Sequence, residues 1–142
     1  NLMINAARAT PNDSIKGGGL YAEGLDNITI NACLFANNRI IAAFTEETNE
    51  AVGGALYLAP DVKHSMISNS VFTGNILEGA SSANYSAFGC TIYSGSDLIL
   101  ESSYFNSNEC RYLRNDSHNG LAVWAQESKI TISNTVMNKA ST

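Results

Sequence analysis

Aliphatic residues alternate with other residues in three of four short windows of the chain. The windows cover residues 27–30, 64–67, 97–100 and 129–132, and three of them hold an aliphatic pair separated by one residue: Ile28/Ile30, Leu98/Leu100 and Ile130/Ile132. Alternation with a period of two, bounded by Gly, Asn, Asp and Ser, predicts β-strands. Apolar residues at the helical spacing of three and four are missing from these windows, so we expect an all-β chain.

Two motifs flank each window in a constant order. A glycine-led motif precedes it, at intervals of 36, 36 and 31 residues: Gly17-Gly18-Gly19-Leu20-Tyr21, Gly53-Gly54-Ala55-Leu56-Tyr57, Gly89-Cys90-Thr91-Ile92-Tyr93 and Gly120-Leu121-Ala122-Val123-Trp124. A motif that begins with Phe and ends with Asn follows it: Phe35-Ala36-Asn37-Asn38, Phe72-Thr73-Gly74-Asn75 and Phe105-Asn106-Ser107-Asn108, decaying to Met137-Asn138-Lys139-Ala140 in the fourth copy. A period of this length is typical of repeat proteins whose units contact their neighbours.

The motifs divide the chain into repeats of one structural unit. The repeats span approximately 1–16 (partial), 17–52, 53–88, 89–119 and 120–142, so we expect 1–142 to be one solenoid segment of a longer chain. Each unit should contain a glycine-led strand, a middle strand and a strand that carries the Phe, followed by a variable polar loop. Three short strands per unit, stacked coil on coil, predict a parallel β-helix of about four coils.

Equivalent residues of successive coils should form ladders. Three ladders are expected to build the core: Leu20, Leu56, Ile92 and Val123; Ile30, Ile67, Leu100 and Ile132; and Phe35, Phe72, Phe105 and Met137. Asn5, Asn38, Asn75 and Asn108 should form an amide ladder at a turn, because Asn tolerates left-handed backbone angles and its amide both donates and accepts hydrogen bonds.

The glycine-led strand also carries one aromatic residue per coil. These residues are Tyr21, Tyr57, Tyr93 and Trp124. Strand alternation sends them outward if Leu20 and its equivalents point inward. Such a row could reinforce the sheet, or it could be a binding strip for a protein or a glycan, since a contiguous exposed aromatic strip is unusual on a monomer.

Cysteines and sequons bear on the compartment. Cys33 occupies the position of Ser70, Ser103 and Thr135 and is expected to be a small buried side chain, whereas Cys90 and Cys110 are candidates for a disulfide in an oxidising compartment. Asn12, Asn27, Asn84 and Asn115 begin Asn-x-Ser/Thr sequons and are candidate glycosylation sites. Three of the four, Asn12, Asn84 and Asn115, fall in the variable loop.

Composition argues against several function classes. Charged residues are 15% of the chain and the formal net charge is −5, which disfavours a nucleic-acid partner. No apolar run is long enough to span a bilayer. His64 and His118 are single, and Asp26, Asp61 and Asp97 are dispersed among turns. We therefore expect no metal, no cofactor, no catalytic residues and no enzymatic activity.

The two motifs resemble the paired repeats of the chlamydial polymorphic outer-membrane proteins. The resemblance rests on Gly-Gly-Ala-Leu at 53–56, on its variants at 17–20, 89–92 and 120–123, and on Phe-x-x-Asn at 35–38, 72–75 and 105–108. It covers nearly the whole segment. The resemblance implies a right-handed parallel β-helix, part of an autotransporter passenger or ectodomain that serves adhesion.

Three functions remain open at this point. The first is an adhesin-like module at the cell surface or outside the cell, with a protein or glycan partner on its outer face. The second is a structural subunit of an extracellular fibre, glycan-decorated and associating end to end. The third is a fragment of a carbohydrate-active β-helix enzyme, which the dispersed carboxylates disfavour.

Overall fold

The computed structural model describes residues 15–42, 50–79, 86–111, 118–119 and 122–138. These residues form nineteen short strands and no helix. All strand pairs are parallel, and each of the five sheets takes one strand from each coil that contributes to it. The expected parallel β-helix is confirmed.

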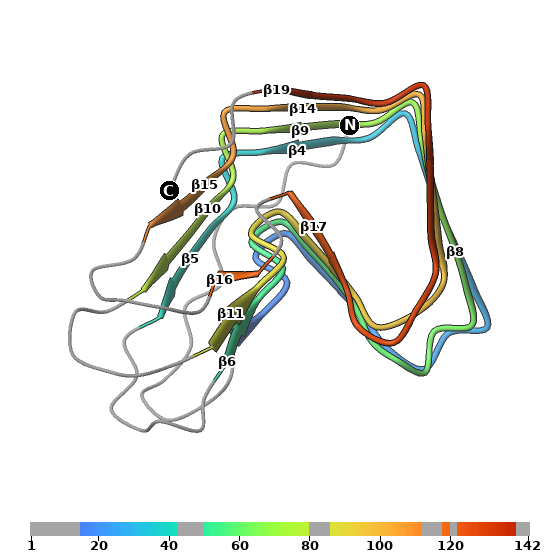
Figure 1. Cartoon of the computed structure of the whole chain (residues 1–142), viewed down its shortest axis with the longest axis horizontal. Coiled ribbons are helices and arrows are strands. Elements are labelled where there is room, and N and C mark those ends of the chain that lie inside the picture. Colours follow the sequence, from blue (N-terminus) through green and yellow to red (C-terminus); the bar gives the residue numbers. More distant parts are fainter. Residues whose placement is uncertain (1–14, 43–49, 80–85, 112–117, 120–121, 139–142) are drawn as a thin grey trace.

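Three of the sheets surround a triangular section (Figure 1). The glycine-led sheet contains β2 (Leu20–Ala22), β7 (Leu56–Leu58), β12 (Ile92–Ser94) and β17 (Val123–Ala125). The middle sheet contains β3 (Asn27–Asn31), β8 (His64–Ser68), β13 (Leu98–Glu101) and β18 (Ile130–Ser133). The third sheet contains β4 (Leu34–Ala36), β9 (Val71–Thr73), β14 (Tyr104–Asn106) and β19 (Val136–Asn138).

Two further sheets project from this triangle as an arm, on the left of Figure 1. One contains β5 (Arg39–Ala42), β10 (Ile76–Gly79) and β15 (Glu109–Arg111), and the other β1 (Ile15–Lys16), β6 (Glu50–Val52), β11 (Ser86–Phe88) and β16 (His118–Asn119). The expectation of three strands followed by a polar loop was therefore wrong. These strands are only two to four residues long, too short for alternation to reveal them.

Columns of left-handed residues turn the chain at three corners. They are Ala32, Asn69, Ser102 and Asn134; Asn37, Gly74 and Ser107; and Gly17, Gly53 and Gly89, all with φ between 47° and 67°. Gly suits these corners because it has no Cβ atom to be crowded, and Asn tolerates the left-handed conformation better than most residues, whereas Ala32, Ser102 and Ser107 adopt it without either advantage. The repeated corners keep successive coils in register.

The predicted core ladders are confirmed by the strand register. Leu56 pairs with Leu20 and Ile92, Ile67 with Ile30 and Leu100, and the Phe rings of neighbouring coils stack at 4.7 Å. In the middle coils these side chains are 0–1% exposed. In the fourth coil Ile132 and Met137 are 49% and 42% exposed, because the described chain places no coil beyond them.

The amide ladder is confirmed for three of its four members. Asn75 Oδ1 accepts hydrogen bonds from the backbone N–H and the side-chain Nδ2 of Asn38, at 3.1 and 2.9 Å. Asn108 Oδ1 accepts the same pair from Asn75, at 3.0 and 2.9 Å. All three residues are buried, with exposures of 0–3%. Asn5 lies outside the described residues.

A second ladder runs along the column that contains Cys33. Ser70 Oγ accepts the backbone N–H of Cys33 at 3.2 Å, and Ser103 Oγ accepts that of Ser70 at 3.2 Å. Each hydroxyl also donates to the carbonyl two residues earlier, as in Ser70 to Ser68 at 2.8 Å. Cys33 repeats that donation with its thiol, at 3.3 Å to Asn31. Cys33 is half-buried and free, so its expected burial is only partial.

Candidate functional site

The tyrosines of the predicted binding strip stack on one another and form an aromatic column. The rings of Tyr21 and Tyr57 stack at 5.1 Å with planes 6° apart, and those of Tyr57 and Tyr93 at 4.9 Å and 9°. Trp124 pairs in register with Tyr93. The column lies on the opposite face of the glycine-led sheet from Leu56, as alternation predicts.

Most of this column is covered, which contradicts the exposed strip expected from the sequence. Tyr57 and Tyr93 are only 5% and 6% exposed, Trp124 is half-buried, and Tyr21 alone is open to solvent at 44%. The adjoining sheet of the arm supplies part of the cover. Lys16 Nζ in β1 lies 5.2 Å from the centroid of the Tyr57 ring, and Phe88 in β11 stacks on Trp124 at 5.3 Å.

This cover changes the acidity of the tyrosines. Burial raises the pKa of Tyr57, and it raises the pKa of Tyr93 to about 12. The pKa of Tyr21 is also raised to about 12, but the main cause is a hydrogen bond. The Tyr21 hydroxyl donates to Glu23 Oε2 at 2.6 Å, and this bond favours the protonated hydroxyl. The Tyr93 hydroxyl donates to Gln126 Oε1. Tyr57 and Tyr93 therefore belong to the packed interior rather than to a docking surface, whereas Tyr21 at the end of the column is exposed.

A disulfide joins the arm to the triangle. Cys90, in the glycine-led turn of the third coil, is bonded to Cys110 in β15, with Cα atoms 5.6 Å apart and both side chains buried. In the first two coils a glycine faces an aliphatic side chain at this position. A Cβ atom on Gly18 would lie 3.2 Å from Ile40 Cγ1, and one on Gly54 would lie 3.5 Å from Leu77 Cβ. The bridge thus replaces a glycine–aliphatic contact.

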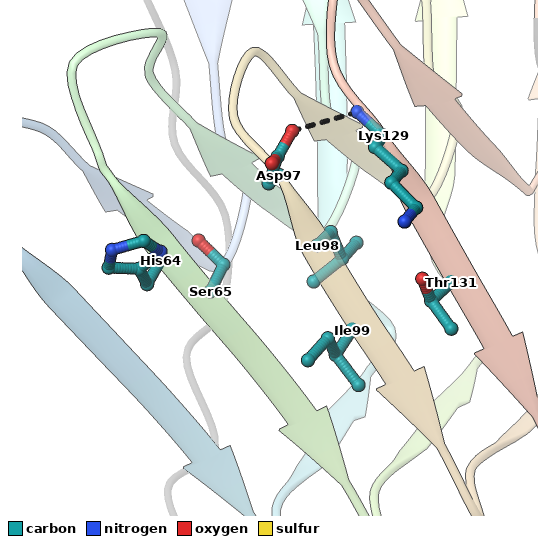
Figure 2. Close-up of a pocket in the computed structure, with 7 residues that line it drawn as sticks. All are labelled: His64, Ser65, Asp97, Leu98, Ile99, Lys129 and Thr131. Carbon is teal, nitrogen blue, oxygen red and sulfur yellow. Dashed lines mark hydrogen bonds between the residues drawn. The ribbon is translucent and has the colours of Figure 1, made fainter.

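A hollow of about 220 Å³ opens on the outer face of the middle sheet (Figure 2). It crosses β8, β13 and β18, and it is lined by His64, Ser65, Asp97, Leu98, Ile99, Lys129 and Thr131. Strand alternation explains its place. Ser65 and Leu98 are buried beneath the sheet, so the outer surface above them is backbone between two rows of outward side chains.

The two rows give the hollow mixed chemistry. One row holds His64, Asp97 and Lys129, and the other holds Ile99 and Thr131, all of them exposed. Asp97 Oδ1 accepts the backbone N–H of Lys129 at 2.9 Å (the dashed line in Figure 2), while the Lys129 side chain points down the strand. A carboxylate, an ammonium, an imidazole, a hydroxyl and an aliphatic side chain therefore surround one small space.

The hollow does not hold a Ser-His-Asp nucleophile arrangement, although it contains all three residue types. The Ser65 hydroxyl is buried and hydrogen-bonded to the Ser96 hydroxyl at 3.1 Å, on the opposite face of the strand from His64. Among the seven lining residues Asp97 is the only carboxylate. This arrangement can bind through hydrogen bonds and apolar contact, but it presents no aligned nucleophile and base.

Sequence reasoning treated His64 and Asp97 as isolated turn residues and missed their alignment. The strand register places His64, Asp97 and Lys129 at one level of neighbouring coils. The signal was present, because each residue immediately precedes or begins the alternating window of its coil.

The candidate glycosylation sites are only partly placed. Asn27, at the start of β3, and Thr29 in the same sequon are both exposed. Asn12, Asn84 and Asn115 lie outside the described residues, and so does the side chain of His118. The described ranges contain no group of three or more His, Cys, Asp or Glu residues that could hold a metal ion, and no helix that could cross a membrane.

Comparison with known proteins gives no relative. No protein-family model matches the chain, and neither the curated proteins nor the solved structures contain a significant match.

Proposed function

We propose that this chain is a non-enzymatic module outside the cell or at its surface, which binds a protein or a glycan through the outer faces of its β-helix. The observation that carries the proposal is an apolar row on the outer face of the third sheet, next to the hollow-bearing middle sheet. The row aligns Leu34, Val71, Tyr104 and Val136 in register across four coils. Tyr104 is 39% and Val136 49% exposed.

Leu34 and Val71 are half-buried, so the row is a partly exposed apolar surface, which suits a contact surface. Outward positions of a solvated sheet face are normally polar, and contiguous exposed apolar patches mark interaction sites. Aromatic residues such as Tyr104 often anchor interfaces because they bury much area at a small entropic cost. We therefore place the proposed binding surface on the outer faces of the third and middle sheets, and not on the covered tyrosine column.

The disulfide and the repeat motifs support the proposed location. Disulfides persist in oxidising compartments, and the Cys90–Cys110 bridge is buried where the arm meets the triangle. The motifs resemble those of autotransporter passengers, which agrees with an adhesin-like role. A binding role also fits the single carboxylate of the hollow, since hydrolysis of a glycosidic bond generally uses a pair.

Adhesion measurements test the proposal. The chain is applied to cells, to immobilised extracellular-matrix proteins and to a glycan array, beside the variants Tyr104→Glu and Val136→Glu. Both variants should lose adhesion while circular dichroism stays unchanged. Leu25→Glu is the matched control, because Leu25 is similarly exposed at 42% but lies in the turn before β3. Equal adhesion by all three variants, or none by the unaltered chain, would refute the proposal.

A further inference from the structure

We propose that the hollow on β8, β13 and β18 is a binding subsite for a saccharide ring that carries adjacent hydroxyl groups. This inference rests on the proposed function, because it names the ligand class for one of the outer faces. It assigns binding to Asp97, Lys129, Ile99 and Thr131, none of which belongs to the tyrosine column.

The charged pair matches the chemistry of neighbouring hydroxyls. Asp97 can only accept hydrogen bonds and Lys129 can only donate them through its ammonium, whereas a sugar hydroxyl does both. Only Oδ1 of Asp97 takes part in the bond to the Lys129 N–H, so Oδ2 is outside that contact. The two residues directly precede the neighbouring strands β13 and β18, whose backbones are about 4.8 Å apart. Adjacent hydroxyls on one ring can therefore reach both groups.

The ammonium is available for such a bond. Among the described residues Lys129 forms no ion pair, whereas Lys63, which directly precedes β8, is held by Asp26 at 2.5 Å. The lining of the hollow contains one acidic side chain, Asp97, beside this one ammonium group. The hollow therefore favours a neutral polyhydroxylated ligand over a strongly acidic or basic one.

The second row supplies an apolar wall. Ile99 is 47% exposed, and Thr131 stands next to it in register on β18. Sugar rings have C–H faces that pack against such surfaces while their hydroxyls bond at the edge. The hollow thus offers apolar contact on one side and charged hydrogen-bonding groups on the other (Figure 2).

Its size limits the ligand and the affinity. A volume of about 220 Å³ is smaller than the roughly 300–1,000 Å³ of pockets that enclose drug-sized ligands. One ring of a longer glycan fits this space better than a whole oligosaccharide. A single ring in an open hollow should bind with a dissociation constant in the millimolar range, and clustered copies of the module would raise the avidity.

Titration by nuclear magnetic resonance tests the subsite on the whole chain. Methyl α-mannopyranoside and methyl β-glucopyranoside are the probes, and the backbone amide shifts of residues 64–66, 97–99 and 129–131 are the readout. At least one probe should shift these amides in a saturable way. Asp97→Asn should weaken its binding by about tenfold or more, since hydrogen bonds to charged groups are the strong ones. Lys129→Gln should weaken it similarly.

Glu101→Gln is the matched control, because Glu101 is the last residue of β13 whereas Asp97 directly precedes the first. Its titration should match that of the unaltered chain. The subsite is refuted if neither probe shifts the named amides, or if Asp97→Asn and Glu101→Gln bind alike. If the unaltered chain still adheres to proteins or glycans in that case, only the subsite fails; if it adheres to nothing, the proposed function fails as well.

Discussion

Replacing Asn75 with Leu should remove the middle rung of the buried amide ladder. Asn75 Oδ1 is the acceptor for two donors of Asn38, the backbone N–H and the side-chain Nδ2. An orphaned buried donor costs about 1 to 3 kcal/mol, so the two together should lower the free energy of unfolding by about 2 to 6 kcal/mol. The loss of the bonds from Asn75 Nδ2 to Phe35 O and Asn108 Oδ1 acts in the same direction. Urea denaturation followed by circular dichroism measures the change.

Two further variants separate the ladder from general disruption. Asn138→Leu is the control, because Asn138 is exposed and donates one long bond of 3.3 Å to Tyr104 Oη; it should cost less than about 0.5 kcal/mol. Asn75→Asp keeps an acceptor for Asn38 but sets a carboxylate against Asn108 Oδ1. Burial and that neighbour should raise its pKa, so its deficit should shrink as the pH falls. Equal losses for Asn75→Leu and Asn138→Leu would refute the ladder.

Three other changes test the packing. Tyr57→Ala should cost about 3 kcal/mol or more in a urea melt, as for other buried aromatics, whereas Tyr21→Ala at the open end of the column should cost clearly less; equal costs would mean that the column is not covered. Gly54→Ala should be among the most damaging substitutions, because the new Cβ would lie 2.1 Å from the Cys90 carbonyl oxygen, and a normal melting temperature would contradict that contact. The free energy of unfolding should fall as the pH rises from about 10 towards 12, because Tyr93 ionises at a lower pH in the unfolded chain than in the folded one. Tyr93→Phe should make the free energy of unfolding depend less on pH in this range, and an unchanged dependence would refute the role of Tyr93.

The sequence predicted the triangular part of the fold because that part is repeated with little variation. Phe35, Phe72 and Phe105 follow the aromatic residue of their glycine motifs by 14, 15 and 12 residues, and the structure stacks them as expected. The repeat sets the register because a slip of one residue would turn Phe72 out of the core and would turn an outward-facing neighbour, Val71 or Thr73, into it. Ladders of identical residues were therefore predictable without any tertiary model.

The arm was not predictable in the same way. Its strands β6 and β11 read Glu-Ala-Val and Ser-Ala-Phe, which share only a central Ala between a polar and an apolar residue and are too short to show alternation. Alternation places Tyr57 on the face away from the core, but it does not say whether another sheet lies against that face. The error about the tyrosine column follows from this, since an outward side chain is exposed only where no other part of the chain covers it.

One signal for the arm was present in the cysteines. Cys90 stands where Gly18 and Gly54 stand in earlier coils, and Cys110 stands where the structure places Ile40 and Leu77. A glycine opposite an aliphatic side chain, exchanged for two cysteines in a later repeat, indicates that both positions face each other in every coil. Paired substitution between repeats of one chain thus carries contact information that local periodicity lacks. Applied to the first two coils, the same pairing places β5 and β10 against the glycine turn. It thereby predicts that a further sheet leads into that turn and lies beside the tyrosines.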